Sequence, residues 1–175
     1  MALATLTKTG RAAIALAISS RPLHLAWGSG SPEWDADDPV LPSLVDSTAL
    51  VNELGRRTPS RIGFVEPDEA GDIVIPVAAG AEDAVQEARY RLTDGPTPYL
   101  YVQTAYAYSD APNAVIREMG LFMDTEFVDG LPEGQRYFVP AELRNPGLLL
   151  AAQIIIPRIN RSPSVRQTVE FVLPI

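Results

Sequence analysis

Apolar residues in this chain come in short runs, most of them separated by proline, glycine or acidic residues. The run 165–173 alternates most clearly, with Val169 and Phe171 on one face and Thr168 and Glu170 on the other. This period of two is typical of a strand with one solvent-exposed face. Comparable runs predict strands at 23–27, 61–65, 72–77, 89–93, 99–108, 114–124, 137–140 and 148–156. We expect the last two long strands, 148–156 and 165–173, to form a hairpin.

Two stretches depart from the strand pattern. Thr7 or Thr9 can cap a helix over about residues 10–19, whose small apolar face, centred on Ile14 and Ile18, should pack on a sheet. A second, shorter helix is expected near 48–54. The pattern therefore predicts a mainly β (α+β) fold: an antiparallel, β-sandwich-like domain with an N-terminal helix and one further short helix.

Composition narrows the class of protein. The 175 residues suit a single domain, 1–175, and no apolar run is long enough to span a bilayer. Without cysteine, thiolate metal sites, disulfides and cysteine nucleophiles are excluded. The net charge of −8 makes nucleic acid an unsuitable partner. The one histidine, His24, alternates with leucines and is interpreted as structural or surface. We expect no enzyme, cofactor, metal or membrane association.

Three stretches invite a functional interpretation. Residues 28–31, Gly-Ser-Gly-Ser, lack the rest of a phosphate-loop motif, so a glycine turn is the better interpretation. The acidic stretch 33–38 lacks the spacing of a calcium loop and is interpreted as a solvated loop. The tyrosine-rich strand 99–108 is either an oligomer contact or ordinary sheet surface.

The stretch 114–124 is unusual because the charged pair Arg117-Glu118 lies inside an apolar strand and is followed by Gly120. Neighbouring strand residues point to opposite faces, so these two should not pair with each other. We expect at least one to be buried and hydrogen-bonded, with Arg56 as a candidate partner for Glu118. Gly120 should mark a bulge or a close backbone approach.

This stretch also carries a family resemblance. Residues 116–122, Ile-Arg-Glu-Met-Gly-Leu-Phe, resemble the signature of the N-terminal attachment domain of bacteriophage tail-collar fibre proteins. Residues 26–30 resemble the family's A-x-G-x-G turn, and residues 48–56 its T-x-L-x-N-E-x-x-R segment, although Gly55 stands where the family has a larger residue. The residues that the resemblance marks as a structural signature are Ile116, Arg117, Glu118, Gly120, Leu121, Phe122, Arg56, Gly28 and Gly30.

The resemblance implies a structural protein of the virion tail, assembled in the host cytoplasm. It would be a baseplate or collar component that docks tail fibres or joins tail parts, with tail proteins, fibres and further copies of itself as partners. Because the sequence ends at Ile175 without a fibre shaft, we expect a stand-alone attachment module. The alternative is a small receptor- or carbohydrate-binding β-sandwich of a virion, which exposed Trp27 and Trp34 would support.

Overall fold

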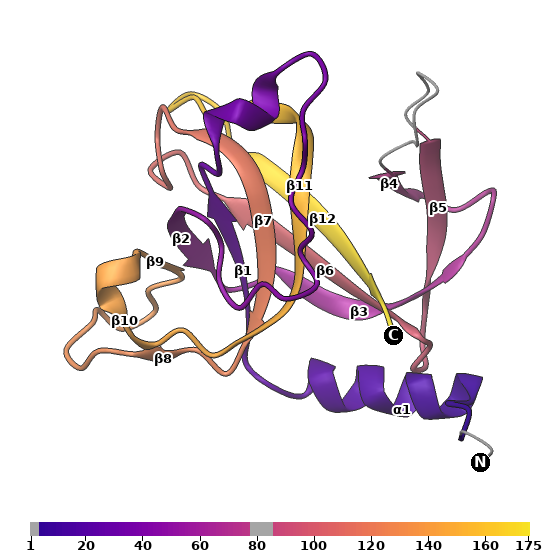
Figure 1. Cartoon of the computed structure of the whole chain (residues 1–175). Coiled ribbons are helices and arrows are strands. Elements are labelled where there is room, and N and C mark those ends of the chain that lie inside the picture. Colours follow the sequence, from indigo (N-terminus) through magenta and orange to yellow (C-terminus); the bar gives the residue numbers. More distant parts are fainter. Residues whose placement is uncertain (1–3, 78–85) are drawn as a thin grey trace. The chain divides into compact units, whose positions relative to one another are not determined.

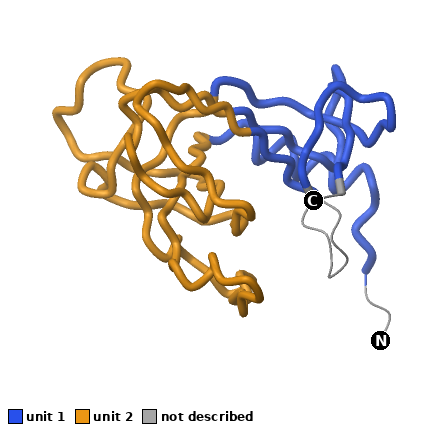
Figure 2. The backbone as a smooth tube through the Cα atoms, turned by 90° about the horizontal axis from the view of Figure 1, so that it is seen from above, with its two compact units in different colours: residues 1–21, 60–103, 170–175 blue, residues 22–59, 104–169 orange. Residues whose placement is uncertain are grey.

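The computed structural model describes residues 4–77 and 86–175, and these form two compact units (Figure 2). Unit 1 contains residues 1–21, 60–103 and 170–175, and unit 2 contains residues 22–59 and 104–169. From the sequence alone, residues 81–89 could form either a helical turn or a loop that enters a strand. Residues 81–85 lie outside the described residues, and from Gln86 onward the chain is a strand. In the described part of the chain, no helix has the length and apolar character needed to cross a membrane.

Unit 2 is built on a five-stranded sheet in the order β11-β7-β1-β2-β9 (Figure 1). Its strands are β1 (Leu23–Gly28), β2 (Glu53–Arg57), β7 (Val115–Met123), β9 (Tyr137–Phe138) and β11 (Leu148–Asn160). The short strands β8 (Glu126–Phe127) and β10 (Leu143–Asn145) form a separate pair. One apolar cluster on this sheet consists of Ala26, Leu50 and Phe122, with Leu149 and Ala152 packed against it.

The second five-stranded sheet has the order β12-β6-β3-β5-β4. Its strands are β3 (Arg61–Pro67), β4 (Ile73–Val77), β5 (Gln86–Thr93), β6 (Tyr99–Tyr106) and β12 (Gln167–Pro174). In unit 1 its core is formed by Val65, Ile73 and Tyr101. The predicted class, mainly β with antiparallel sheets and consistent with a β-sandwich-like fold, is confirmed.

The predicted hairpin of 148–156 with 165–173 is wrong. β11 pairs with β7, whereas β12 belongs to the other sheet beside β6. The signature strand β7 likewise pairs with β1 and β11, and not with β6, which precedes it in the sequence. Alternation identifies strands, but it does not reveal which distant strand supplies the hydrogen-bonding partner.

The N-terminal helix, α1 (Lys8–Ser19), exists, and Thr7 caps it by accepting a hydrogen bond from Gly10 N at 3.1 Å. Its predicted packing face is wrong for Ile14, which is 39% exposed, whereas Ile18 is half-buried and Ala15 is fully buried. Arg11, one turn before Ala15, donates to Ile175 O at 2.6 Å. The buried side of the helix is therefore centred on Ala15, with Ile18 half-buried, whereas Ile14 and Leu16 face outward.

The predicted helix near 48–54 is also wrong. Residues 48–52 form bends, and β2 begins at Glu53. Backbone N–H groups that a helix would use are taken by the carboxylate of Glu118, which binds Val51 N and Asn52 N. Apart from α1, the helices in residues 4–77 and 86–175 are two 3-10 turns, η1 (Pro32–Asp35) and η2 (Pro140–Glu142).

Candidate functional site

The predicted signature residues lie together in unit 2, on and around β7. This strand runs between β1 and β11, with Gly28 paired to Glu118 and Ala26 paired to Gly120. Ile116, Leu121 and Phe122 are at most 1% exposed. The signature is therefore a buried central strand and not an exposed binding surface.

The carboxylate of Glu118 holds two separate loops by their backbone. It is 4% exposed and accepts hydrogen bonds from Val51 N at 3.0 Å, Asn52 N at 2.9 Å and Gly30 N at 3.2 Å. Asn52 adds a bond from Nδ2 to Ser29 Oγ at 2.6 Å. Glu118 is thus buried and hydrogen-bonded, as predicted, but its partners are backbone amides and not Arg56.

The two predicted turn glycines, Gly28 and Gly30, leave space for the Glu118 carboxylate and the Trp34 ring. A Cβ on Gly28 would lie 2.7 Å from Asn52 O and would collide with the Glu118 carboxylate. Gly30 has a φ of +53°, and a Cβ there would strike the ring of Trp34. The glycine turn expected at 28–31 is therefore required by close approach as well as by backbone conformation.

Arg117 holds a third segment. Its Nε and Nη2 donate to Asp35 Oδ2 at 3.0 and 2.7 Å, and its Nη1 donates to Ser29 O at 2.9 Å. Arg158 contacts the same carboxylate oxygen. Hydrogen bonding from Arg117 lowers the pKa of Asp35 below its usual range. The acidic residues of 33–38 are exposed, as predicted, although Asp35 is held by two arginines. Arg117 and Glu118 bind different partners, also as predicted.

Gly120 shows neither a bulge in its own strand nor a close backbone. A Cβ there would lie 2.8 Å from Leu149 Cδ1 and 3.0 Å from Leu50 Cδ2, so two leucine side chains cover it. The register shift lies in the neighbouring strand β11, between Leu149 and Ala151. A glycine fits here because the apolar cluster needs the space of the missing side chain.

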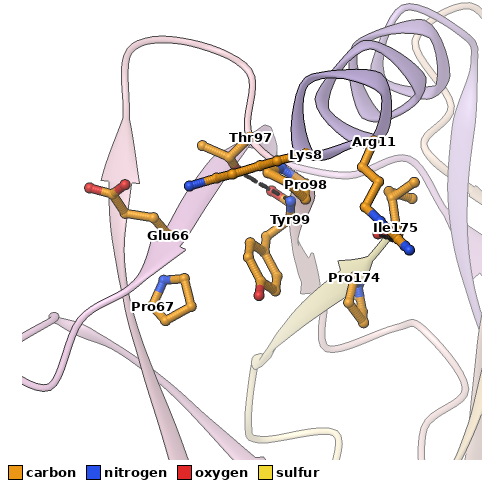
Figure 3. A pocket seen from close by; sticks show the side chains of 9 residues that line it. All are labelled: Lys8, Arg11, Glu66, Pro67, Thr97, Pro98, Tyr99, Pro174 and Ile175. Atoms are coloured by element: carbon orange, nitrogen blue, oxygen red, sulfur yellow. Dashed lines mark hydrogen bonds between the residues drawn. The ribbon is translucent and has the colours of Figure 1, made fainter. Parts of the chain in front are cut away.

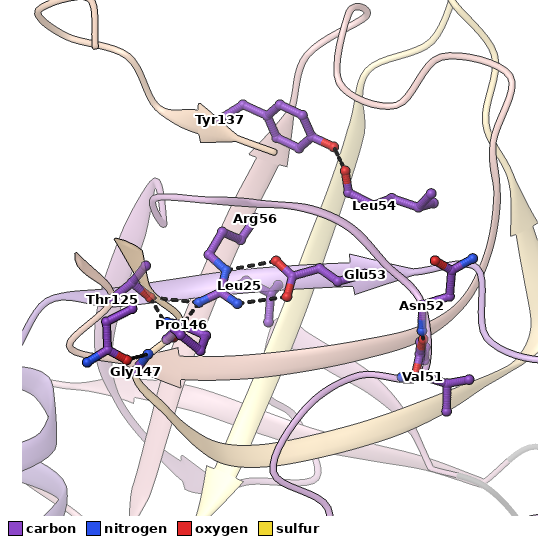
Figure 4. Close-up of polar contacts among 12 residues, drawn as sticks. Leu25, Val51, Asn52, Glu53, Leu54, Arg56, Thr125, Tyr137, Pro146 and Gly147 are labelled. Carbon is purple, nitrogen blue, oxygen red and sulfur yellow. Dashed lines mark hydrogen bonds and ion pairs between the residues drawn. The ribbon is translucent and has the colours of Figure 1, made fainter. Parts of the chain in front are cut away.

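Arg56 forms a second buried polar cluster (Figure 4). Its guanidinium is fully buried and binds Glu53 with two hydrogen bonds at 2.7 and 2.8 Å. Its Nη1 donates to Thr125 Oγ1 at 2.7 Å and to Pro146 O at 2.6 Å. The guanidinium also lies 3.9 Å from the ring centroid of Phe122. The prediction that Arg56 pairs with Glu118 is wrong. The ionic partner of Arg56 is Glu53, three residues earlier in the same strand.

Gly55, where the resembled family has a larger residue, lies against Tyr137. The ring of Tyr137 fills the space that a Cβ would need, and its hydroxyl donates to Leu54 O at 3.2 Å. An aromatic ring from β9 thus occupies the position beside Arg56.

Sequence reasoning missed a third buried polar group. Arg161 is 6% exposed and donates to Val165 O at 2.9 Å and Ala107 O at 2.7 Å, with its guanidinium 5.0 Å from the Trp27 ring. Nearby, Asp110 pairs with Arg57 at 2.5 Å. Arg161 and Asp110 both lie between predicted strands, where charged residues are ordinarily solvated, so composition gave no signal that they are buried.

His24 is buried, at 6% exposure, among aromatic rings. Its ring packs edge-on against Phe127 and Phe138, and Nδ1 has no hydrogen-bond partner among the described residues. Burial, and secondarily the charge of Arg56, lower the pKa of His24 from 6.5 to about 4. It is a neutral structural histidine at pH 7.

The aromatic residues do not form an exposed platform. Trp27 is fully buried and stacks on Tyr106, with 3.4 Å between the ring centroids, and Trp34 is 8% exposed. Within the tyrosine-rich strand Tyr101 is also buried, although Tyr108, beyond the end of β6, is 47% exposed. The exposed tryptophans that would have supported a carbohydrate-binding protein are not observed.

A cavity of about 640 Å³ lies in unit 1 (Figure 3). Lys8, Arg11, Pro67, Tyr99 and Pro174 are among its lining residues, and none of the predicted signature residues contributes. In residues 4–77 and 86–175, no group of three or more acidic or histidine side chains is placed to hold a metal ion.

The signature residues thus fix loops to a central strand. The chain belongs to the family of baseplate wedge 3 tail fiber network components, whose family model matches residues 1–175. None of the curated proteins compared with the chain matches it. The predicted phage-tail class is confirmed at the level of the baseplate and tail-fibre family, which places the protein in the virion tail.

Proposed function

We propose that this protein is a non-catalytic component of the phage baseplate that docks tail fibres or joins tail parts. The observation that carries the proposal is the family match over the full sequence, since the family is one of tail-fibre network components. The buried polar clusters support it, because Glu118, Arg117 and Arg56 are engaged in holding loops in place. The function would then rest on interface burial, with other baseplate proteins and fibres as partners.

The narrower resemblance to tail-collar fibre attachment domains is part of the same proposal. Its support is the signature 116–122 together with the turn 28–30, which Glu118 joins through Gly30 N. The proposal includes a single functional module, 1–175, that is assembled in the host cytoplasm.

A deletion of the gene in the phage tests this function. We expect particles that lack fibres or have incomplete baseplates, with normal particles restored by the wild-type gene. Mass spectrometry of purified virions should detect the protein at a fixed copy number. Normal fibre-bearing particles from the deletion, or absence of the protein from virions, would contradict the proposal.

Self-association is a further part of the proposal, and the outward face of α1 supports it. Ile14 is 39% exposed and Leu16 is 48% exposed, and Ala13 and Ala17 beside them are exposed as well. Residues 1–32 contain three cationic side chains and no Asp or Glu, whereas the whole chain has a net charge of −8. A second copy therefore offers a surplus of carboxylates to this cationic segment.

Sedimentation velocity of the purified protein tests the second copy. We expect a concentration-dependent oligomer that Leu16→Glu weakens and that Val165→Glu, at a 52% exposed position in unit 2, leaves unchanged. A monomer at all concentrations would contradict self-association through this helix.

A further inference from the structure

Arg117 and Glu118 hold the two ends of one segment. Arg117 binds Asp35 at the end of η1, and Glu118 binds the backbone of Val51 and Asn52 just before β2. Between these anchors, residues 36–50 form no helix or strand. We call residues 36–50 the clamped loop. All of these groups lie in unit 2.

The clamped loop exposes apolar side chains. Val40 is 95% exposed and Val45 is 90% exposed, and Leu41 is 40% exposed. Leu50, in contrast, is buried in the apolar cluster that covers Gly120. The loop is therefore anchored to the core at its end while its middle presents valines to solvent, which is an arrangement that favours a protein contact.

The charge of the loop is of one sign. Asp37, Asp38 and Asp46 are exposed, and the sequence contains no Lys or Arg between Arg21 and Arg56. A partner surface with lysine or arginine at its rim complements this charge. A second copy of this acidic chain fits less well here than a basic protein.

The prolines of the loop decide how it can be recognised. Pro39 and Pro42 have no N–H and flank Val40 and Leu41, so the segment cannot complete the hydrogen-bond ladder of a sheet edge. Recognition must come from side chains that enter pockets, as in other proline-containing peptide contacts.

From these observations we infer that the clamped loop is a docking element, which inserts Val40 and Val45 into an apolar groove with a basic rim on another tail protein. The inference rests on the proposed function and adds the surface through which it acts. Arg117 and Glu118 are positioning residues, because they hold the ends of the loop and leave its middle free for the partner.

Incorporation of variants into virions tests the inference. The deletion phage is complemented with the full chain carrying Val40→Ser and Val45→Ser, and copies per virion are counted by quantitative mass spectrometry. We expect at least a tenfold loss relative to wild type. The matched control, Val128→Ser with Val165→Ser, also alters two exposed valines of unit 2, at 37% and 52%, and should incorporate normally.

Charge is tested in the same assay. The triple variant Asp37→Asn, Asp38→Asn, Asp46→Asn should also lose at least tenfold, whereas Glu69→Gln, Asp94→Asn, Glu133→Gln, at exposed positions elsewhere, should not. Melting temperatures of the purified variants should equal that of the wild type, because all the altered side chains are exposed. Normal incorporation of either loop variant would overturn the inference.

The partner is identified by crosslinking in assembled virions. A photoreactive phenylalanine at position 45 should crosslink to a different tail protein, at a peptide that contains apolar residues and Lys or Arg. The same group at Val139, 40% exposed, should not. A crosslink only to a second copy of this chain would overturn the inference. Wild-type protein missing from virions would instead overturn the proposed function, so the two failures are distinguishable.

Discussion

Gly28 and Glu118 lie directly opposite each other in the pairing of β1 with β7. Because Gly28 has no side chain, the Glu118 carboxylate can lie over the neighbouring strand and reach the amides of Val51 and Asn52. Gly28 and Glu118 therefore depend on each other in the structure, although they are far apart in the sequence. Four predictions about fold stability follow from this and the neighbouring clusters.

Replacement of Glu118 by Ala should destabilise the fold strongly. Three backbone amides would lose their acceptor, and each unmade buried hydrogen bond costs about 1–3 kcal/mol, so we expect a loss of about 3 kcal/mol or more. Urea unfolding measures this change. Glu133→Ala, at an exposed position, should change stability by less than about 0.5 kcal/mol. Equal unfolding midpoints for both variants would show that the carboxylate is dispensable.

Gly28→Ala should destabilise the protein by about 1–3 kcal/mol, because the added methyl group would overlap the Glu118 carboxylate and approach Asn52 O to 2.7 Å. The control is Gly95→Ala, where nothing lies within 4 Å of the added Cβ. Thermal unfolding should separate the two variants clearly. A Gly28→Ala protein as stable as the Gly95→Ala protein would contradict the close approach.

Arg56 and Glu53 should show strong energetic coupling. Arg56→Met leaves Glu53 without its cation and should cost about 3–5 kcal/mol, as is usual when one member of a buried pair is removed. Adding Glu53→Gln removes the unpaired charge, so the double variant should lose less than the sum of the single losses. A double-mutant cycle by urea unfolding measures the coupling, and strictly additive losses would contradict it.

His24 should make stability depend on pH below neutrality. Burial lowers the pKa of His24 to about 4 in the folded protein, whereas the ordinary value of 6.5 applies in the unfolded chain. The unfolded chain therefore binds the proton more readily. The contribution of neutral His24 to the free energy of unfolding is therefore fully present above pH 6.5. It is lost as the pH decreases toward 4, by about 3 kcal/mol in total. Unfolding measured from pH 7 to pH 4.5 should show this loss in the wild type.

His24→Phe provides the control for this titration, since it keeps an aromatic ring between Phe127 and Phe138 and removes the titratable nitrogen. Its stability should change much less over the same pH range. Identical slopes for the two proteins would mean that another group causes the loss.

Much of the local structure could be predicted from the sequence. The strand at 114–124 was recognisable by its branched and large apolar residues, and β7 covers 115–123. The burial of Glu118 followed from a carboxylate within an apolar run. The partners of that carboxylate could not be predicted, because backbone amides exist at every position and carry no distinguishing residue type. The packing face of α1, on which Ala15 is buried and Ile14 exposed, also depends on distant segments, so the sequence could not settle it.

By itself, the sequence determined where most of the longer strands lie and that a threonine, Thr7 or Thr9, caps the first helix, because periodicity and capping are properties of neighbouring residues. The short strands β2, β8 and β10 were not predicted. Tertiary structure decided which strands pair, that residues 48–52 bend instead of forming a helix, and that Arg117 and Glu118 hold the ends of the clamped loop. Those outcomes depend on contacts between distant segments. There, a buried carboxylate or guanidinium takes the best hydrogen-bond partners that the completed fold brings within reach.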